Sequence, residues 1–292
     1  MNISVILTTY NAAAWLEKVL WGYAAQRFSD FELVIADDGS KPETAELIDR
    51  MRSELDLEIQ HVWQEDRGFQ KCRILNKAIL HARHDYLVFS DGDCIPRADF
   101  LSVHAARAQH GCFLSGSYYK LPMSTSEIIG RDDIESGRCF DRTWLIAHGL
   151  PRSSKKWKLN APPGLAPWLN RLVPTKCNFK GSNASAWMQD VLAVNGFNEN
   201  MHYGGLDREF GVRLINLGIR PLHVRYDAIV IHLDHPRGYR DAQMMATNKA
   251  IRLDITRRGI TRTSRGISDL LTEGYAISEH GAAQRYLELL RA

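Results

Sequence analysis

Two aspartates flank a glycine in Asp91-Gly92-Asp93, directly after the apolar run Tyr86–Phe89. Carboxylates two residues apart at the end of a strand can hold a divalent cation with one group and a nearby ligand with the other. Mg²⁺ and Mn²⁺ favour oxygen ligands and often share them with substrate phosphates. The stretch could equally be an ordinary tight turn, because Asp-Gly is a common turn pair. Its chemistry therefore depends on the polar residues that the fold brings beside it.

A second acidic pair, Asp37-Asp38, follows the apolar run Phe31–Ile35. A carboxylate beyond a strand can accept hydrogen bonds from ribose hydroxyls or from the N–H of a base. The alternative is a helix cap, in which Asp38 or Ser40 caps a helix that begins at Pro42. Both interpretations stay open at this point.

Three basic residues, Arg67, Lys71 and Arg73, lie where a loop beginning at Glu65 runs into a helix. They could meet phosphate oxygens, with the help of the N–H groups at the helix N-terminus. The alternative is a solvated, charged helix start.

Paired glycines, Gly204-Gly205, precede Asp207 in the first turn of a later helix. Such glycines let the backbone approach a substrate closely. The helix dipole favours an ionised carboxylate at this place, and that carboxylate could accept a proton. Acidic residues in a first turn are also commonplace structural features. After a late strand, His232 could complete a carboxylate metal site or serve a structural role.

The first 117 residues alternate between short apolar runs and helical patterns. The predicted strands are Ile3–Leu7, Phe31–Ile35, Leu57–Trp63, Tyr86–Phe89 and Cys112–Ser117. The predicted helices are Ala12–Gln26, Pro42–Glu54, Gln70–Ala82 and Arg97–Gln109. This alternation predicts an α/β fold, a Rossmann-like and mostly parallel sheet with helices on both faces. Ligands bind beyond the carboxyl ends of such strands, where five polar residues lie: Asn11, Asp37, Asp38, Asp91 and Asp93.

The pattern weakens between residues 118 and 176. Residues 151–176 contain five of the ten prolines together with Lys155, Lys156 and Lys158, which predicts a long, mobile loop. Regular patterning resumes over Phe179–Trp187 and a helix near Gln189–Val194, and a strand is predicted over Pro221–Ile231. The last 55 residues are helical and polar.

The composition is that of a soluble globular protein, with 45% hydrophobic and 24% charged residues. A net charge of +3 is too small to indicate a nucleic-acid partner. The five cysteines form no C-x-x-C pair, so neither a disulfide framework nor a zinc site is indicated, and reduced thiols fit a cytoplasmic location. No signal peptide and no run of 18 apolar residues is present, so any membrane contact is expected to be peripheral.

Taken in their order along the chain, the motifs resemble the inverting family-2 glycosyltransferases of the GT-A fold. The resemblance covers roughly residues 2–235 and rests on these segments: Thr8-Thr9-Tyr10-Asn11, Ala36–Ser40, Gln64–Asn76, Phe89–Pro96 and Gly204–Phe210. The stretch Phe179–His232 is similar to the branch that contains bacterial chondroitin polymerase and the galactosyltransferase-type C-terminal segment. This branch often has Gly-Gly-Glu-Asp where the chain has Leu206 before Asp207, which affects expectations about the acceptor but not about the reaction type.

The resemblance implies a GT-A catalytic domain over residues 1–235, with a nucleotide-binding half (1–117) and an acceptor-binding half (118–235) that includes the mobile loop. A helical, basic extension follows over 236–292. The residues implied in binding the nucleotide sugar are Thr8, Tyr10, Asn11, Asp37, Asp38, Arg67, Lys71, Arg73, Asn76, Asp91 and Gly92. Asp93 and His232 would hold Mn²⁺ or Mg²⁺ (the DXD motif), with His235 as a substitute ligand. Asp207 would be the catalytic base, with Gly205 and Glu209 as further candidates beside it.

The implied activity is a metal-dependent, inverting transfer of a sugar from a nucleotide donor, most simply UDP-linked, to a hydroxyl of a saccharide or lipid-linked saccharide acceptor. Assembly of lipopolysaccharide or another surface polysaccharide, at the inner face of the cell membrane, is the process implied. The basic segment 237–265 could meet an anionic membrane surface, or it could be a solvated basic helix.

Two other classes of protein deserve comparison. A nucleotidyltransferase of similar fold should show a glycine-rich, basic loop after the first strand, where this chain reads TTYNAAAW. A non-catalytic nucleotide-sugar-binding protein would keep the pocket and lose the base, whereas Asp207 is present.

Overall fold

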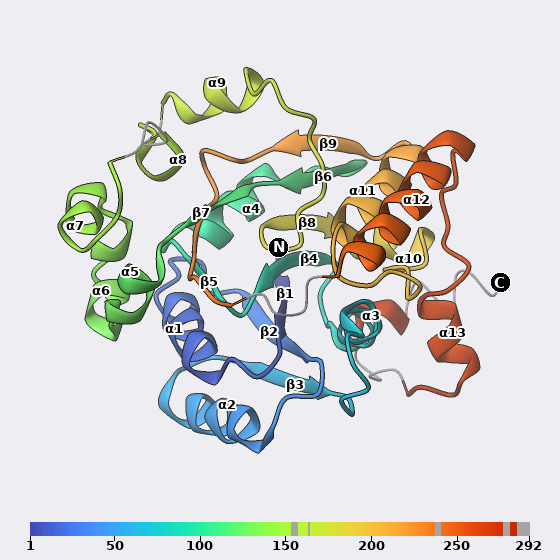
Figure 1. The fold of residues 1–292 in the computed structure, drawn as a ribbon, viewed down its shortest axis with the longest axis horizontal. Coiled ribbons are helices and arrows are strands. Elements are labelled where there is room, and N and C mark those ends of the chain that lie inside the picture. Colours follow the sequence, from blue (N-terminus) through green and yellow to red (C-terminus); the bar gives the residue numbers. More distant parts are fainter. Residues whose placement is uncertain (153–156, 163, 237–240, 277–280, 285–292) are drawn as a thin grey trace.

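Apolar runs in the first 91 residues form the parallel part of a seven-stranded sheet (Figure 1). In the computed structural model, which describes residues 1–152, 157–162, 164–236, 241–276 and 281–284, β1 (Ile3–Thr9) is buried along its whole length. It pairs in parallel with β2 (Phe31–Asp37) and β4 (Tyr86–Asp91), and β2 pairs in parallel with β3 (Ile59–Trp63). The carboxyl ends of these four strands therefore meet at one edge.

The second part of the sheet contains one reversed strand. β8 (Ala184–Trp187) pairs antiparallel with both β4 and β6 (Cys112–Ser115), and β6 pairs in parallel with β9 (Arg220–His223). The strand order is β3-β2-β1-β4-β8-β6-β9. The predicted sheet, mostly parallel with helices around it, is confirmed.

A separate three-stranded sheet was not predicted. It consists of β5 (Cys94–Pro96), β10 (Ile229–His232) and β7 (Ser117–Lys120). The single strands predicted over Cys112–Ser117 and Pro221–Ile231 were wrong, because each region is divided between the two sheets. The first division falls at Gly116, where a Cβ atom would lie 2.3 Å from the side chain of Asn183.

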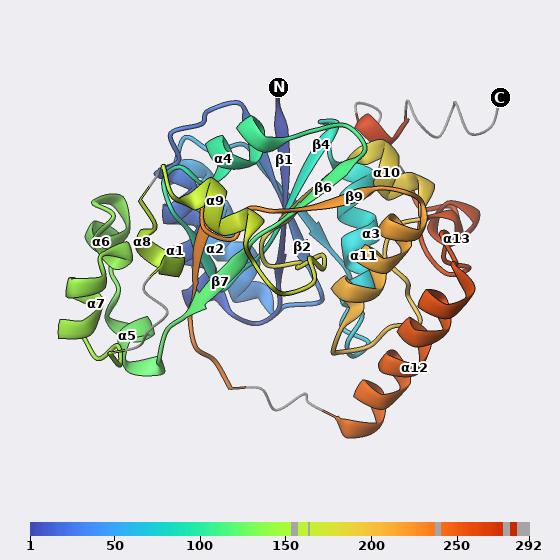
Figure 2. The same ribbon diagram turned by 90° about the horizontal axis from the view of Figure 1, so that it is seen from above.

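Helices cover both faces of the large sheet (Figure 2). Three lie on one face: α1 (Ala13–Ala24), α2 (Pro42–Glu54) and α4 (Phe100–Arg107). Three lie on the other: α3 (Lys71–His81), α10 (Met188–Ala193) and α11 (Leu206–Asn216). Alternation along β1 separates the two cores, since Ile3, Val5 and Leu7 face the first group and Ile6 faces the second.

Short helices lie beside the sheet between β7 and β8: α5 (Met123–Ile128), α6 (Arg131–Glu135), the 3₁₀ turn η1 (Arg138–Phe140), α7 (Arg142–Ala147), α8 (Trp157–Asn160) and α9 (Ala166–Arg171). The segment 151–176 predicted as a loop therefore includes two helices, α8 and α9. Lys155, Lys156 and Pro163 lie outside the described residues.

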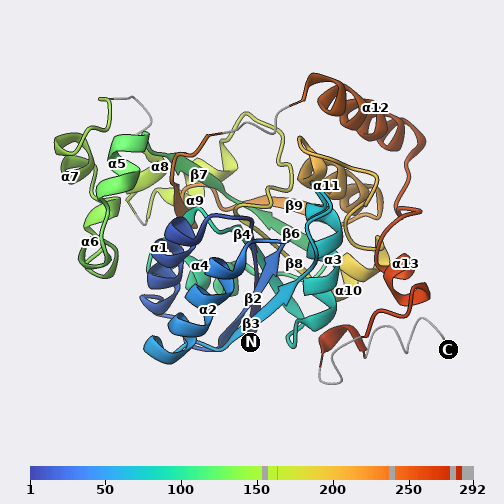
Figure 3. The same cartoon turned by 60° about the horizontal axis from the view of Figure 1, so that its bottom comes forward.

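The C-terminal segment packs against the same side of the sheet as α3 and α11. α12 (Ala242–Arg258) lies along α11 (Figure 3), and α13 (Ile267–Thr272) adds Ile267 and Leu270 to the core that contains α3. Within the described ranges, no helix combines the length and the apolar character needed to cross a membrane.

A buried ion pair fixes α11 to the core. Arg213 and Glu209 are both fully buried, and the Arg213 Nε atom lies 2.9 Å from Glu209 Oε1. Arg213 also donates to the carbonyl oxygen of Gly196 at 2.8 Å, and Asn198 donates to Glu209 at 3.3 Å. The pair thus ties α11 to the loop after α10.

We expect Glu209→Gln to lower the free energy of unfolding by about 3–5 kcal/mol, because it leaves the Arg213 guanidinium buried without its counter-charge. Urea denaturation measures this. The control is Glu135→Gln, which removes an exposed pair at the same i, i+4 spacing with Arg131 and should leave stability unchanged. Equal effects in the two variants would contradict the argument.

Candidate active site

The stretch Asp91-Gly92-Asp93 is a turn between β4 and β5. The Gly92 N–H donates to the carbonyl oxygen of Thr8 at 2.7 Å, and a Cβ atom on Gly92 would lie 2.9 Å from that oxygen. A side chain therefore cannot be accommodated at residue 92 without a shift. The turn holds both aspartates at the carboxyl end of the sheet. The stretch is therefore both an ordinary tight turn and a place where two carboxylates can meet a ligand.

Lys71 lies among three acidic groups, two from the turn after β4 and one from α11. Its Nζ atom donates to Asp91 Oδ1 at 2.6 Å, and the Thr8 hydroxyl donates to the same oxygen at 2.8 Å. Burial opposes the charged form of Lys71, but the carboxylates of Asp91, Asp93 and Asp207 outweigh burial and raise its pKa. The structure thus brings the β4 turn, the start of α3 and the start of α11 together around one ammonium group.

Asp38 lies at the same edge, after β2. It is buried, and it accepts hydrogen bonds from Gln64 Nε2 at 2.7 Å and from the Gln70 N–H at 2.9 Å. Burial raises its pKa from 3.8 to about 6, although both hydrogen bonds act in the opposite direction. Asp38 is therefore linked to the segment leading into α3.

The helix-cap alternative for Asp38 and Ser40 was wrong. The N-cap residue of α2 is Lys41, and its side chain makes no capping hydrogen bond. Ser40 instead accepts from the Asn11 N–H at 2.8 Å, while Asn11, with φ of 47°, accepts from the Lys41 N–H at 2.9 Å. Asp37 accepts from the Ser40 N–H at 2.8 Å and lies 3.0 Å from His61. Asn11 thus fastens the end of β1 to the turn after β2, and Asp37 fastens that turn to β3.

Tyr10 and Arg67 form the exposed rim of this edge. Half of the Tyr10 side chain is exposed, and its hydroxyl donates to Asp66 at 2.8 Å. Arg67 is exposed and pairs with Glu65 at 2.8 Å. Both side chains can reorient toward a ligand without breaking the core.

Arg73 and Asn76 were predicted beside the nucleotide, but their contacts lie elsewhere. Arg73 pairs with Glu199 at 3.0 Å and with Glu273 of the C-terminal segment. Asn76 is fully buried, donates to the Phe197 carbonyl at 2.9 Å and accepts from the Phe197 N–H at 2.7 Å. Both side chains hold the segment 197–199 in place.

Asp207 lies in the first turn of α11, after two glycines in the left-handed region, Gly204 (φ 103°) and Gly205 (φ 85°). Its carboxylate accepts from the Arg208 N–H at 2.8 Å and from the Gly181 N–H at 3.4 Å, and burial raises its pKa. Glu209, two residues on, points into the core. Of the two acids, only Asp207 faces the loop that leads into β8.

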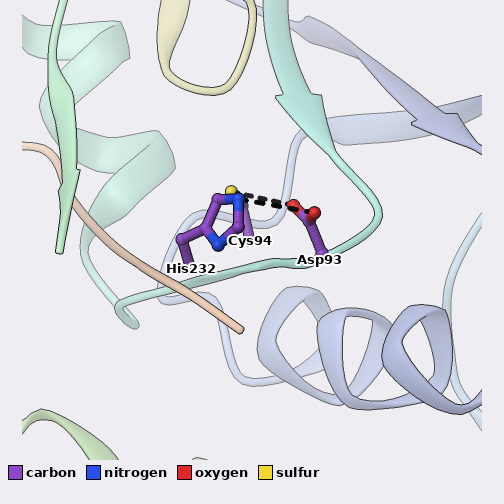
Figure 4. Close-up of side chains that lie close together, drawn as sticks. All are labelled: Asp93, Cys94 and His232. Atoms are coloured by element: carbon purple, nitrogen blue, oxygen red, sulfur yellow. Dashed lines mark hydrogen bonds and ion pairs between the residues drawn. The ribbon is translucent and has the colours of Figure 1, made fainter. Parts of the chain in front are cut away.

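Two histidines lie beside the carboxylate of Asp93. His232 Nε2 lies 3.5 Å and His235 Nε2 lies 3.1 Å from Asp93 Oδ2. Figure 4 shows His232 and Cys94 pointing toward the Asp93 carboxylate, and one ligand atom from each of the three lies within 4.8 Å of the others. Burial works against ionisation of Asp93, but the His235 hydrogen bond and the charges of both histidines outweigh it and lower its pKa.

Cys94 was missed by sequence reasoning. β10 places it next to His232, since the two residues are partners in the β5–β10 register. The only available signal was its position directly after Asp93, because strands of three or four residues have no readable periodicity.

The donor groups around Asp93 suit a divalent cation. His232 presents its Nε2 atom to the Asp93 carboxylate, while its buried Nδ1 atom has no hydrogen-bond partner among the described residues. Burial raises the pKa of the Cys94 thiol well above its usual value, so Cys94 remains a thiol and is a poor ligand for a hard cation. A carboxylate with imidazoles fits Mn²⁺, which accepts both nitrogen and oxygen, better than Mg²⁺, which prefers oxygen.

Comparison with known proteins gives one family. The family model described as Glycosyl transferase family 2 matches residues 4–161. Chondroitin synthase of Pasteurella multocida is 32% identical over 243 residues, which are 75% of this chain and 23% of that synthase. The chain thus spans about a quarter of that relative's length. The predicted resemblance is confirmed.

Two solved structures share the fold. The mannosyltransferase PcManGT from Pyrobaculum calidifontis, in complex with GDP-Man and Mn²⁺, has a TM-score of 0.60 and 18% identity and covers 88% of this chain and 64% of its own. TarS residues 1–349 from S. aureus, in complex with UDP-GlcNAc, has a TM-score of 0.58 and 17% identity and covers 92% and 69%. These likenesses confirm the predicted fold class.

We expect Asp38 to make stability depend on pH. Because its folded pKa of about 6 exceeds 3.8, protonation favours the folded state. This stabilisation is fully present below pH 3.8 and is lost as pH rises through about 6. Relative to Asp38→Asn, the unfolding free energy of the wild type should fall by on the order of 2 kcal/mol between about pH 4 and about pH 7. Urea denaturation across that range measures it, and a difference that does not change with pH would contradict it.

Proposed function

The chain belongs to glycosyl transferase family 2 and is a glycosyltransferase, and from this premise we propose an inverting, metal-dependent transfer of a sugar from a UDP-linked donor to a hydroxyl group of a saccharide acceptor. The observation that supports it most is the convergence of Asp91, Asp93 and Asp207 on Lys71. Family membership favours this reaction over nucleotidyl transfer and over non-catalytic binding.

For the donor, we propose that Thr8, Tyr10 and Asp38 surround the uracil base, and that Asp91 lies near the ribose. The hydrogen bonds that Asp38 accepts from the segment before α3 support its role, because they hold its carboxylate at the carboxyl end of the sheet. Lys71, with Arg67 at the rim, would meet the diphosphate. The TarS structure, which contains UDP-GlcNAc, supports a UDP donor. Arg73 and Asn76 are assigned to holding the segment 197–199 instead.

We assign the divalent cation, Mn²⁺ or Mg²⁺, to Asp93 and His232, with His235 as the next candidate. The Nε2 atom of His232, which lies 3.5 Å from Asp93 Oδ2, supports this, as does the presence of Mn²⁺ in the PcManGT structure. When bound, such an ion stabilises the charge that builds on the departing nucleoside diphosphate.

Asp207 is the proposed catalytic base. It takes the proton of the acceptor hydroxyl while that oxygen bonds to the anomeric carbon and the bond from this carbon to the diphosphate breaks. Its raised pKa makes its carboxylate a stronger base than an ordinary aspartate, and the hydrogen bonds from the Arg208 and Gly181 N–H groups fix the orientation of that carboxylate. Attack from the face opposite the leaving group inverts the configuration.

The acceptor is proposed to be a saccharide or lipid-linked saccharide of a bacterial surface polysaccharide or lipopolysaccharide, reached from the cytoplasm. Contact with an anionic membrane surface receives less support than the sequence suggested. Arg257 and Arg258 pair with Asp254, and Arg262 donates to carbonyl oxygens at the end of α10. Arg237 and Arg240 lie outside the described residues.

The central test is a panel of nucleotide sugars with and without Mn²⁺, scored for hydrolysis and for transfer. Asp207→Asn should lower transfer by about 100-fold or more, since it removes the general base, and should leave UDP binding unchanged. Unchanged turnover in this variant would refute the assignment of the base. If no nucleotide sugar reacts or binds, and Mn²⁺ has no effect, the proposed function fails.

The metal ligands can be separated by electron paramagnetic resonance of Mn²⁺ in the presence of UDP. We expect His232→Ala to weaken Mn²⁺ binding by at least about 10-fold and His235→Ala to weaken it less. Cys94→Ser is the matched control, because Cys94 lies beside Asp93 and His232 but is not assigned to the ion. This variant should bind Mn²⁺ as the wild type does. The reverse order of the two histidine variants would make His235 the ligand.

A further inference from the structure

α12 is a largely exposed helix with one buried polar residue. Its N-terminus is capped by the Asp241 side chain, which accepts from the Met244 N–H at 2.7 Å, and its C-cap is Gly259 in the left-handed region. Between these ends only Asn248 and Ile255 are buried. Asn248 takes part in neither cap, so its buried side-chain amide must have another structural role.

Within the described part of the chain, every hydrogen bond of the Asn248 side chain goes to one short segment. Its Nδ2 atom donates to the carbonyl oxygens of His202 at 2.8 Å, Tyr203 at 3.1 Å and Gly204 at 3.0 Å. Its Oδ1 atom accepts from the His202 N–H at 3.2 Å. Its two N–H groups are shared among three carbonyl oxygens, so one amide is bonded to four backbone groups of this segment.

That segment leads directly to Asp207. Gly204 and Gly205 adopt φ values of 103° and 85°, and α11 begins at the next residue. Two consecutive glycines leave a backbone free to sample many conformations unless it is held. α12 also holds it by packing, since the Cγ atom of Met245 lies 3.2 Å from where a Cβ atom on Gly204 would be.

We propose that Asn248 is a positioning residue for catalysis: from the C-terminal helix it fixes residues 202–204 and thereby the place of Asp207. Asn248 bonds to residues 202–204 and acts on Asp207 through the glycine pair. The inference rests on the proposed role of Asp207 as the base. It makes the C-terminal segment a part of the active site, whereas the sequence indicated only a basic extension after residue 235.

The chain offers a matched control. The Nδ2 atom of Asn216 on α11 donates to the carbonyl oxygens of Ile255 at 3.3 Å and Ile260 at 2.8 Å. Asn216 thus holds the C-terminal end of α12 by side-chain amide to carbonyl hydrogen bonds, away from residues 202–204. Asn248→Ala removes the bonds between α12 and residues 202–204, and Asn216→Ala removes the bonds between α11 and the C-terminal end of α12. Only the first variant therefore releases the segment before Asp207.

We expect Asn248→Ala to lower kcat for transfer by about 10- to 100-fold, because a displacement of about 1 Å at a catalytic group has effects of this size. UDP binding in the presence of Mn²⁺ should stay at the wild-type value in both variants, and Asn216→Ala should keep its kcat. Hydrogen exchange of residues 202–206 should speed up in Asn248→Ala alone. An equal loss of kcat in the two variants, or a loss of UDP binding in proportion to kcat, would overturn the proposal.

Asn248→Asp keeps the size and the acceptor oxygen and removes the donor N–H groups, so it decides the question if the alanine variant does not fold. We expect the same fall in kcat, and wild-type transfer would overturn the proposal. Asp207→Asn distinguishes the two levels of inference. If that variant transfers normally, the base assignment fails; if it is inactive while both Asn248 variants are fully active, only the role of Asn248 fails.

Discussion

The site depends on one electrostatic constraint, the crowding of three carboxylates around Lys71. Asp91 and Asp93 come from the turn after β4 and Asp207 comes from α11, and such like charges repel one another in a partly buried place. The ammonium group compensates them and keeps its proton because of them. The first residue of α3 therefore stabilises the approach of the turn after β4 to the start of α11.

Two further pieces of the fold complete the arrangement from distant parts of the chain. The register of β10 with β5 places His232 opposite Cys94 and so beside Asp93. The buried pair of Arg213 with Glu209 fixes the body of α11, on which Asp207 lies. The first contact joins strands that are far apart in the sequence. The second pair is local to α11, but Arg213 also donates to the carbonyl oxygen of Gly196, and that bond depends on the loop after α10.

The sequence predicted the parts of the site that obey a local rule. The alternation of strands and helices placed Asp38, Asp91 and Asp93 at one edge, and the turn at Gly92 follows from Asp-Gly chemistry. Helix geometry would have separated Arg73 from Lys71, because two residues of an α-helix turn the side chain by about 200°. The second sheet could not be predicted, because its strands have three or four residues and are held by pairing rather than by periodicity.

Asn248 shows why an exposed helix can escape sequence reasoning. Its neighbours Thr247 and Lys249 are polar, and a solvated basic helix explains them well. A buried amide on such a helix must have all its hydrogen bonds satisfied by the protein, and here they are satisfied by three consecutive residues of one loop. A leucine at residue 248 would leave those carbonyl groups unpaired, whereas on an unpartnered helix it would be harmless. The requirement for asparagine therefore comes from the loop, and that loop ends at the residue proposed to accept the proton.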